Sequence, residues 1–157
     1  MIIAHRCNTD GPSEEENTIN ELLKCISSGF LVEIDVWMVG AKVFMGHDHP
    51  SEEIDINFLL RYSDKLFIHC KNIEALCYLK QYECLCVFGH SSDEFVLTSH
   101  LDVFCRVGVI KNGCICVMPE LSNRKFSKDE LKSCKHILTD YPNRYKDEID
   151  NNTFWKK

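Results

Sequence analysis

The chain has 157 residues, a formal net charge of −6 at pH 7, 45% hydrophobic residues and 27% charged residues. This length predicts a single domain over residues 1–157, and the ordinary hydrophobic content excludes a disordered or collagen-like chain. Glu33 and Asp35 interrupt the longest apolar run, so no segment spans a bilayer, and the first residues lack a secretory signal. A net-acidic chain is also a poor ligand for nucleic acid. We therefore expect a soluble, cytoplasmic protein with no stable membrane anchor and no nucleic-acid partner.

The first half of the chain alternates segments with strand-like and helix-like patterns. The expected elements are a strand over residues 2–6, a helix over 18–28, strands over 30–37 and 42–45, a helix from Ser51 to about Tyr62, a strand over 66–71, a helix capped by Asn72 and a strand over 84–88. Alternation of this kind is typical of a parallel sheet covered by helices.

The second half loses the helical period. The expected elements are strands over residues 95–98, 103–107 and 114–118, a short helix after the capping box of Ser127 and Glu130, a strand over 137–139, and a polar tail that frays past about Tyr145. Leaving out 42–45, eight strand candidates suggest a closed barrel. Because a complete (β/α) barrel usually needs about 250 residues, we expect a contracted TIM-like (β/α) barrel with several helices missing in its second half.

The ten cysteines favour buried, reduced thiols over a disulfide framework, because the chain is long and shows no export signal. Cys25 and Cys77 fall on apolar faces of expected helices, and most of the others fall in expected strands, where a free cysteine behaves as a small hydrophobe. The alternative is a zinc site drawn from Cys84-x-Cys86 and Cys114-x-Cys116. Structural zinc sites, however, usually separate their cysteines by about two to four residues.

Polar side chains gather where the early strands end. These residues are His5, Arg6, Glu33, Asp35, His47, Asp48, His69 and Lys71. In parallel α/β folds the carboxyl ends of the strands face one crevice, so we expect these groups to converge. Each residue alone is compatible with an ordinary scaffold or solvated position, and the hypothesis of a site depends on their recurrence at four successive strand ends. Carboxylates hold divalent cations, Arg and Lys balance phosphate charge, and histidines transfer protons near neutral pH.

Five short motifs lie in order along the chain: Ala4-His5-Arg6, Glu16-Asn17-Thr18, Glu33-x-Asp35-Val36, Gly46-His47-Asp48 and Leu138-Thr139-Asp140-Tyr141-Pro142. In this order they resemble the motifs of the glycerophosphodiester phosphodiesterase family, within the phosphatidylinositol-specific phospholipase C-like phosphodiesterases. The similarity is dense over residues 3–48, thin in the middle, and returns over 137–142. The resemblance implies a (β/α) barrel with a divalent metal, Mg²⁺ or Ca²⁺, in its mouth.

The resemblance also implies roles for individual residues. His5 and His47 match the two catalytic histidines, and Arg6 matches the arginine that contacts phosphate. Lys71 falls where the family has a charge-stabilising lysine, which implies a part in catalysis and in substrate binding. In the family a neighbouring hydroxyl of the substrate commonly attacks phosphorus, and the two histidines divide the work of base and acid.

The metal ligands include a departure from the family pattern. Glu33 and Asp35 match two acidic ligands, but His69 occupies the position of the third. Imidazole suits Zn²⁺, Mn²⁺ or iron better than it suits Mg²⁺. Either the metal differs, or Glu120 completes the site, or catalysis has been lost. Cys7 also replaces the glycine that usually follows His-Arg.

From these residues we expect a metal-dependent phosphodiesterase of lipid metabolism that acts on a small glycerophosphodiester-like or related substrate. The competing hypothesis is a non-catalytic barrel module that binds a phosphorylated ligand or a protein partner, which the short chain and His69 favour. We further expect His90 to line the mouth and Asp140 to cap the turn after the last strand. A barrel short of helices leaves apolar strand faces uncovered, and a homodimer is one way to cover them.

Overall fold

Ten strands form one mostly parallel sheet in the computed structural model, which describes residues 1–150. The strands are β1 (Ile2–His5), β2 (Leu31–Val39), β3 (Lys42–Met45), β4 (Glu52–Ile54), β5 (Leu66–Cys70), β6 (Cys86–Phe88), β7 (Phe95–Leu97), β8 (Val103–Cys105), β9 (Ile115–Val117) and β10 (His136–Thr139). The α-helices are α1 (Ile19–Ser27), α2 (Ile56–Arg61), α3 (Ile73–Leu79), α4 (Lys128–Ser133) and α5 (Pro142–Asp150). Within residues 1–150, no helix has the length and apolar character needed to cross a bilayer.

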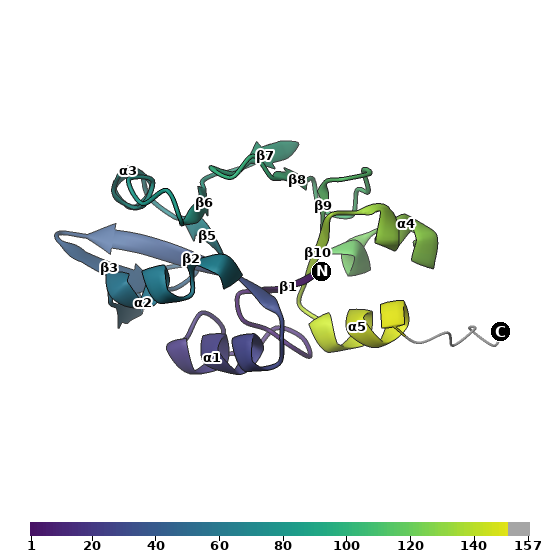
Figure 1. The fold of residues 1–157 in the computed structure, drawn as a ribbon, viewed down its shortest axis with the longest axis horizontal. Coiled ribbons are helices and arrows are strands. Elements are labelled where there is room, and N and C mark those ends of the chain that lie inside the picture. The colour runs from purple at the N-terminus through teal and green to yellow at the C-terminus, as the bar shows by residue number, and fades with distance from the viewer. Residues whose placement is uncertain (151–157) are drawn as a thin grey trace.

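The parallel part of the sheet runs in the order β6, β5, β2, β1, β10, β9, β8, and β7 adds an antiparallel edge to β8. The long β2 continues beyond β5 and pairs there with β3, which pairs in turn with β4. Figure 1 shows these strands following one another around an arc, with α1, α3, α4 and α5 on its outer side. The first and last parallel strands of the chain, β1 and β10, are therefore direct neighbours.

The sheet curves strongly, and this curvature brings its two ends together. The ring of Phe88 on β6 stacks on the ring of Phe104 on β8, with centroids 4.8 Å apart. Ser99, which follows β7, donates its backbone N–H to the carbonyl of Val87 on β6 at 2.8 Å. Among the described strands, however, β6 and β7 are not paired with each other. The ladder of strand hydrogen bonds is therefore interrupted at this point.

Two apolar layers stabilise the curved sheet, because successive side chains of a strand point to opposite faces. Leu22, Leu59 and Leu79 of α1, α2 and α3 pack against one face of β2. The other face has its own core, made of Ile3, Leu31, Phe67, Cys86, Phe88, Phe104, Ile115 and Leu138. This second core draws on strands from both ends of the sheet order, as a concave surface requires.

Each strand and helix expected from the sequence is present as an element of the expected type, and the shortage of helices in the second half is confirmed as well. Between Leu79 and Lys128 the described chain contains no α-helix. The sheet is open as described, so the mixed α/β class with a mostly parallel sheet is established and the closed barrel remains a prediction.

Three local expectations were wrong. The helix expected from Ser51 begins later, because the preceding segment pairs with β3 as β4 and the Asp55 side chain accepts from the Asn57 N–H at 2.6 Å. The tail expected to fray past Tyr145 is helical through residue 150, and burial of Tyr145 ties this helix to the core. Cys77, expected on a buried face, is exposed, since α3 turns Ala75 and Leu79 inward instead.

Candidate functional site

Strand register brings the polar residues of the early strands together at one end of the sheet. His5 on β1 lies opposite Glu33 on β2, and Asp35 on β2 lies opposite His69 on β5. A cavity of about 880 Å³ opens at this end. Its polar lining includes His5, Arg6, Glu33, Asp35, His47, His69, Lys71 and His90. The convergence expected from the strand ends is thus present, and His5 and His47 line the same cavity.

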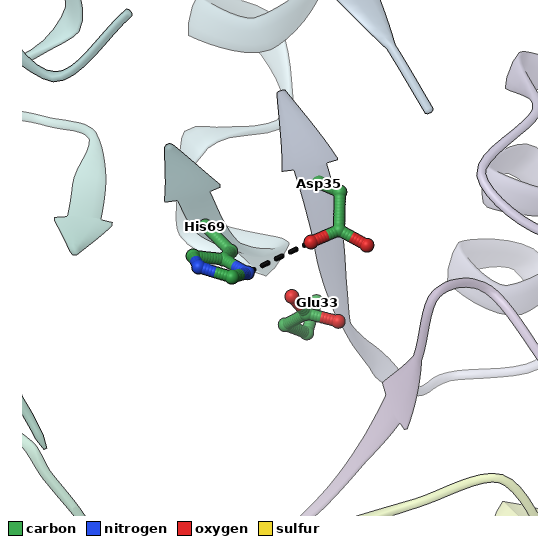
Figure 2. A group of neighbouring side chains, drawn as sticks. All are labelled: Glu33, Asp35 and His69. Atoms are coloured by element: carbon green, nitrogen blue, oxygen red, sulfur yellow. Dashed lines mark hydrogen bonds and ion pairs between the residues drawn. The ribbon is translucent and has the colours of Figure 1, made fainter. Parts of the chain in front are cut away.

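Glu33, Asp35 and His69 form the candidate metal site. Each offers one ligand atom, and these atoms all lie within 4.8 Å of one another, which holds for no other such group within residues 1–150. Figure 2 shows both carboxylates on β2 and the His69 ring on the neighbouring β5. Because Glu33 and Asp35 are two residues apart on one strand, their side chains lie on the same face of the sheet, the concave face that carries the second core. Two carboxylates and an imidazole fit a divalent cation that accepts both oxygen and nitrogen ligands.

Asp35 is the best-connected carboxylate of the site. It shares a 2.8 Å hydrogen bond with His69 Nδ1 and accepts one from Asn17 Nδ2 at 3.0 Å. Lys71 Nζ lies 3.4 Å from Oδ1, and Arg6 Nε lies 3.3 Å from Oδ2. Burial alone would raise the pKa of Asp35, but the hydrogen bond from His69 and the charges of His69 and Lys71 outweigh it and hold this pKa well below its usual range. Asp35 is therefore an anion throughout the physiological pH range.

Glu33 has fewer favourable partners. Its Oε2 accepts from the backbone N–H of Arg6 at 3.2 Å and lies 4.0 Å from His5 Nε2. Burial, followed by the nearby charge of Asp35, raises the pKa of Glu33 above its usual value. A cation placed between the two carboxylates would relieve this repulsion, so the site has the electrostatics expected of a divalent-ion site.

His5 is held by a residue from the last strand. Its Nδ1 hydrogen-bonds Asp140 Oδ1 at 2.8 Å, and Asn8 Nδ2 donates to the same oxygen at 2.9 Å. Burial lowers the pKa of His5, but the hydrogen bond with Asp140 and the charge of Glu33 outweigh it, and the net pKa is raised. His5 is thus a largely buried imidazole that Asp140 orients, as a general acid or base requires.

Asp140 was expected to cap the turn after β10, and the structure gives this task to its neighbour. The Thr139 hydroxyl accepts from the Tyr141 N–H at 3.0 Å. Asp140 reaches His5 because β1 and β10 are paired, with Ala4 opposite Thr139. The position of Asp140 at the end of the last predicted strand was the signal available in the sequence, since the first and last strands of a barrel are neighbours.

The structure does not bring Glu120 to the candidate metal site. Its Oε1 accepts from the Thr139 hydroxyl at 2.8 Å and from the Asp140 N–H at 3.1 Å. Met118, before the single-turn 3₁₀ helix Pro119–Leu121, has a left-handed backbone with φ of 47°. The chain turns there, and Glu120 supports the end of β10 instead of contributing a ligand to the cluster.

His47 lies in a tight turn after β3, and Gly46 is required for that turn. Gly46 has φ of +144°, and a Cβ at this residue would lie 2.2 Å from the carbonyl oxygen of His49. Its carbonyl accepts from the Trp37 indole N–H at 2.6 Å, which ties the turn to β2. His47 Nδ1 hydrogen-bonds Asp48 at 2.8 Å, and the Asp48 side chain is 85% exposed. The turn thus holds the His47 ring at the cavity edge with a weaker, solvent-screened carboxylate partner.

The Glu16-Asn17 motif positions the site from behind. Asn17 Oδ1 accepts from the Asp35 N–H at 2.9 Å, while its side-chain amide donates to the Asp35 carboxylate. Glu16 pairs with the Arg6 guanidinium at 3.2 Å. Arg6 and Cys7 have left-handed backbones with φ of 50° and 66°, so Cys7 occupies a conformation that favours glycine. The sequence suggests this motif only through the family resemblance and does not predict that it supports Asp35 and Arg6.

Aromatic stacking fixes the His69 ring, which sequence reasoning did not anticipate. The ring lies parallel to that of Phe88, with centroids 5.1 Å apart, and stacks on His90 at 4.5 Å. Burial, followed by the charges of His69 and Lys71, lowers the pKa of His90. His90 lines the cavity, as expected. The stack turns the His69 ring edge toward Asp35.

Comparison with known proteins adds no assignment to this geometry. No protein-family model matches the chain, and neither the curated proteins nor the solved structures contain a significant match.

Proposed function

We propose that this chain is a metal-dependent phosphodiesterase with a contracted (β/α) barrel, acting on a small glycerophosphodiester-like or related substrate. One observation carries the proposal: His5 and His47, two buried carboxylates and two cationic side chains line a single cavity at the carboxyl ends of the parallel strands. Phosphodiester cleavage uses each of these groups, because charge must be neutralised at phosphate while one proton is removed and another is delivered.

Glu33, Asp35 and His69 would hold the divalent cation. Their ligand atoms are mutually close, and the imidazole favours Mn²⁺ or Zn²⁺ over Mg²⁺ or Ca²⁺. When bound, such an ion supplies positive charge to the phosphate oxygens as a Lewis acid.

Arg6 and Lys71 would bind the phosphate. Both contact Asp35, at 3.3 and 3.4 Å, and both line the cavity. Because each carries its charge on a long side chain, each can reach a phosphate oxygen while staying close to Asp35. The guanidinium of Arg6 also offers parallel donors that match two phosphate oxygens.

His5 would accept the proton of the attacking hydroxyl. Asp140 keeps a proton on Nδ1 of His5, so Nε2 presents its lone pair. As the new O–P bond forms, the proton of the attacking hydroxyl passes to Nε2 of His5. His47 delivers a proton to the leaving oxygen as the old O–P bond breaks. Asp140 is nearly buried, whereas Asp48 beside His47 is exposed, which makes His5 the better-held base.

The test is turnover of a chromogenic phosphodiester after metal removal and reloading with single divalent ions. We expect His5→Ala to lower turnover by about 10²–10⁴-fold, the usual contribution of general acid–base catalysis. The matched control is His100→Ala, because His100 is exposed and hydrogen-bonds only the Glu83 carbonyl in the described contacts. Equal turnover by His5→Ala and the unchanged chain would overturn the proposal.

A second function, metal-independent binding of a phosphorylated ligand, is favoured by one observation. His69, Lys71 and Arg6 all contact Asp35, so three cationic or protonatable groups already face this carboxylate. Calorimetry separates the two functions. Metal binding that is lost in Glu33→Gln with Asp35→Asn supports the enzyme, whereas binding of a phosphodiester that is equal in chelator and in metal supports the module.

A further inference from the structure

Asn8 is a buried polar residue to which the proposed reaction gives no role. Only 3% of the residue is exposed. Its side-chain amide donates to Asp140 Oδ1 at 2.9 Å and to Glu16 Oε2 at 3.1 Å, while its side-chain carbonyl accepts from the Ser13 hydroxyl at 3.5 Å. The Asn8 side chain therefore joins two carboxylates that are far apart in the sequence.

Each of these carboxylates holds a side chain that the proposed reaction uses. Asp140 Oδ1 hydrogen-bonds His5 Nδ1 at 2.8 Å. Glu16 Oε1 accepts from Arg6 Nη1 at 3.2 Å. Because His5 and Arg6 are neighbours in the sequence, the contacts form a closed ring with Asn8 on its opposite side. Loss of the Asn8 amide would therefore weaken the support of both side chains at once.

The backbone that carries His5 and Arg6 needs such a support. Arg6 and Cys7 both have left-handed backbones, with φ of 50° and 66°, which are unfavourable for residues other than glycine. The Asn8 N–H closes this turn by donating to the His5 carbonyl at 2.9 Å. A strained backbone persists where the surrounding contacts over-determine it, and Asn8 supplies such contacts from its backbone and from its side chain.

An amide suits this position because it donates two hydrogen bonds and carries no charge. Burial alone would raise the pKa of Asp140, but the hydrogen bond and charge of His5, followed by the hydrogen bond from Asn8, hold it below its usual value. A cationic side chain between Asp140 and Glu16 would neutralise the charge that binds His5 and Arg6, and a third carboxylate would repel both. A neutral donor avoids both effects.

We propose that Asn8 is a positioning residue that holds His5 and Arg6 in one fixed arrangement. Asn8 does not line the cavity, so it acts through Asp140 and Glu16. Its part in catalysis rests on the proposed phosphodiesterase function, whereas the arrangement itself does not. Because a general base determines the rate of the chemical step and Arg6 contributes to phosphate binding, Asn8 influences both turnover and affinity.

Asn8→Leu tests the proposal, because leucine has a similar size and no amide. The proton on His5 Nδ1, assigned by its absence in His5→Ala, should give a downfield ¹H NMR resonance that Asn8→Leu weakens or abolishes. Calorimetry should show that inorganic phosphate binds about tenfold more weakly, the equivalent of one hydrogen bond to a charged group. The matched control is Asn20→Leu, which removes an exposed amide that contacts Glu21 at 3.4 Å and should change neither measurement.

A second variant keeps the test valid if circular dichroism shows that Asn8→Leu does not fold. Asn8→Asp keeps the size of the side chain but introduces a carboxyl that donates a hydrogen bond only while it is protonated. Because Asp140 and Glu16 lie beside it, this carboxyl should have a raised pKa. Phosphate affinity of Asn8→Asp, relative to that of the unchanged chain at the same pH, should therefore fall as pH rises. A side chain that only fills space would give a constant ratio.

Turnover of a chromogenic phosphodiester adds the catalytic test. Asn8→Leu should lower kcat and raise KM, since the supports of His5 and Arg6 are both weakened. Two results would overturn the proposal: an unchanged His5 resonance with unchanged phosphate affinity in folded Asn8→Leu, or a constant affinity ratio in Asn8→Asp. Neither result depends on turnover. If the unchanged chain cleaves no phosphodiester, the proposed function fails, and the resonance and the phosphate affinity still decide whether Asn8 holds His5 and Arg6.

Discussion

Replacing Asp140 with asparagine tests how the site holds His5. The change keeps the shape of the side chain but removes its charge. Because His5 Nδ1 and Asn8 Nδ2 both hydrogen-bond the same Asp140 oxygen, the introduced side chain would keep its amide oxygen at that position, and Nδ1 would still donate to it. The tautomer of His5 would therefore be kept, but the negative charge that makes Nε2 a stronger base would be lost.

The expected size follows from the geometry of the pair. The His5–Asp140 hydrogen bond is 2.8 Å long, and the two side chains are only 17% and 7% exposed, so solvent screens it little. Hydrogen bonds to charged groups contribute about 1.5–3 kcal/mol. We expect a loss of stability in that range and, because His5 without the carboxylate is a weaker base, a decrease in turnover that does not exceed about 10²–10⁴-fold, the full contribution of general acid–base catalysis.

The pH dependence has a defined sign. The pKa of His5 in the folded chain is raised above 6.5, so the stability that this pair contributes is fully present below 6.5 and is lost as pH rises through the folded pKa. Burial lowers the pKa of His5, and Asp140 is the main group that raises it. Without the carboxylate of Asp140, the pKa of His5 should therefore fall. The difference in unfolding free energy between the two proteins should therefore be larger below pH 6.5 than well above it.

The assays are urea denaturation on both sides of that pH and NMR titration of the His5 ring. Asp129→Asn is the matched control, because Asp129 is an exposed aspartate on α4. An unchanged pKa of His5 in Asp140→Asn, or full turnover by this variant, would refute the reasoning that the charge of Asp140 strengthens the base.

Three further predictions follow from the fold and the metal ligands. Phe104→Ala should lower the unfolding free energy by about 3–5 kcal/mol in urea denaturation, because its ring stacks on Phe88 from the opposite end of the sheet. Phe95→Ala, at a residue that is 68% exposed, should change the unfolding free energy little, and similar losses in the two variants would contradict the packing described. Gly46→Ala should destabilise the fold by more than Gly40→Ala, because, of these two glycines, only Gly46 has backbone atoms where a Cβ would lie. The cost at Gly40 is limited to about 1–2 kcal/mol of left-handed backbone strain, and equal costs in urea denaturation would argue against the tight turn. His69→Asp should shift metal preference in calorimetry from Zn²⁺ or Mn²⁺ toward Mg²⁺, since an oxygen ligand replaces nitrogen; an unchanged preference would show that His69 does not bind the metal.

Local patterns in the sequence determined most of the secondary structure and the first part of the site. The spacing of apolar residues predicts α1, and strict alternation predicts β2 with Glu33 and Asp35 on one face. Side chains at the ends of parallel strands necessarily face one edge of the sheet, so the convergence of His5, Asp35 and His69 could be anticipated. These predictions succeed because they depend on short-range periodicity and on the direction of strands.

Tertiary structure alone decided the contacts between distant segments. Asp140 orients His5 only because β1 and β10 pair across 135 positions of sequence. The end of α4 likewise lies against the beginning of β9, where Lys135 donates its N–H to the Cys114 carbonyl at 2.9 Å. Periodicity specifies which face a side chain occupies, but the neighbour across that face depends on strand order and on how far the sheet curves. Those quantities are set by the packing of the whole core, in which residues such as Phe88 and Phe104 meet from opposite ends of the sheet.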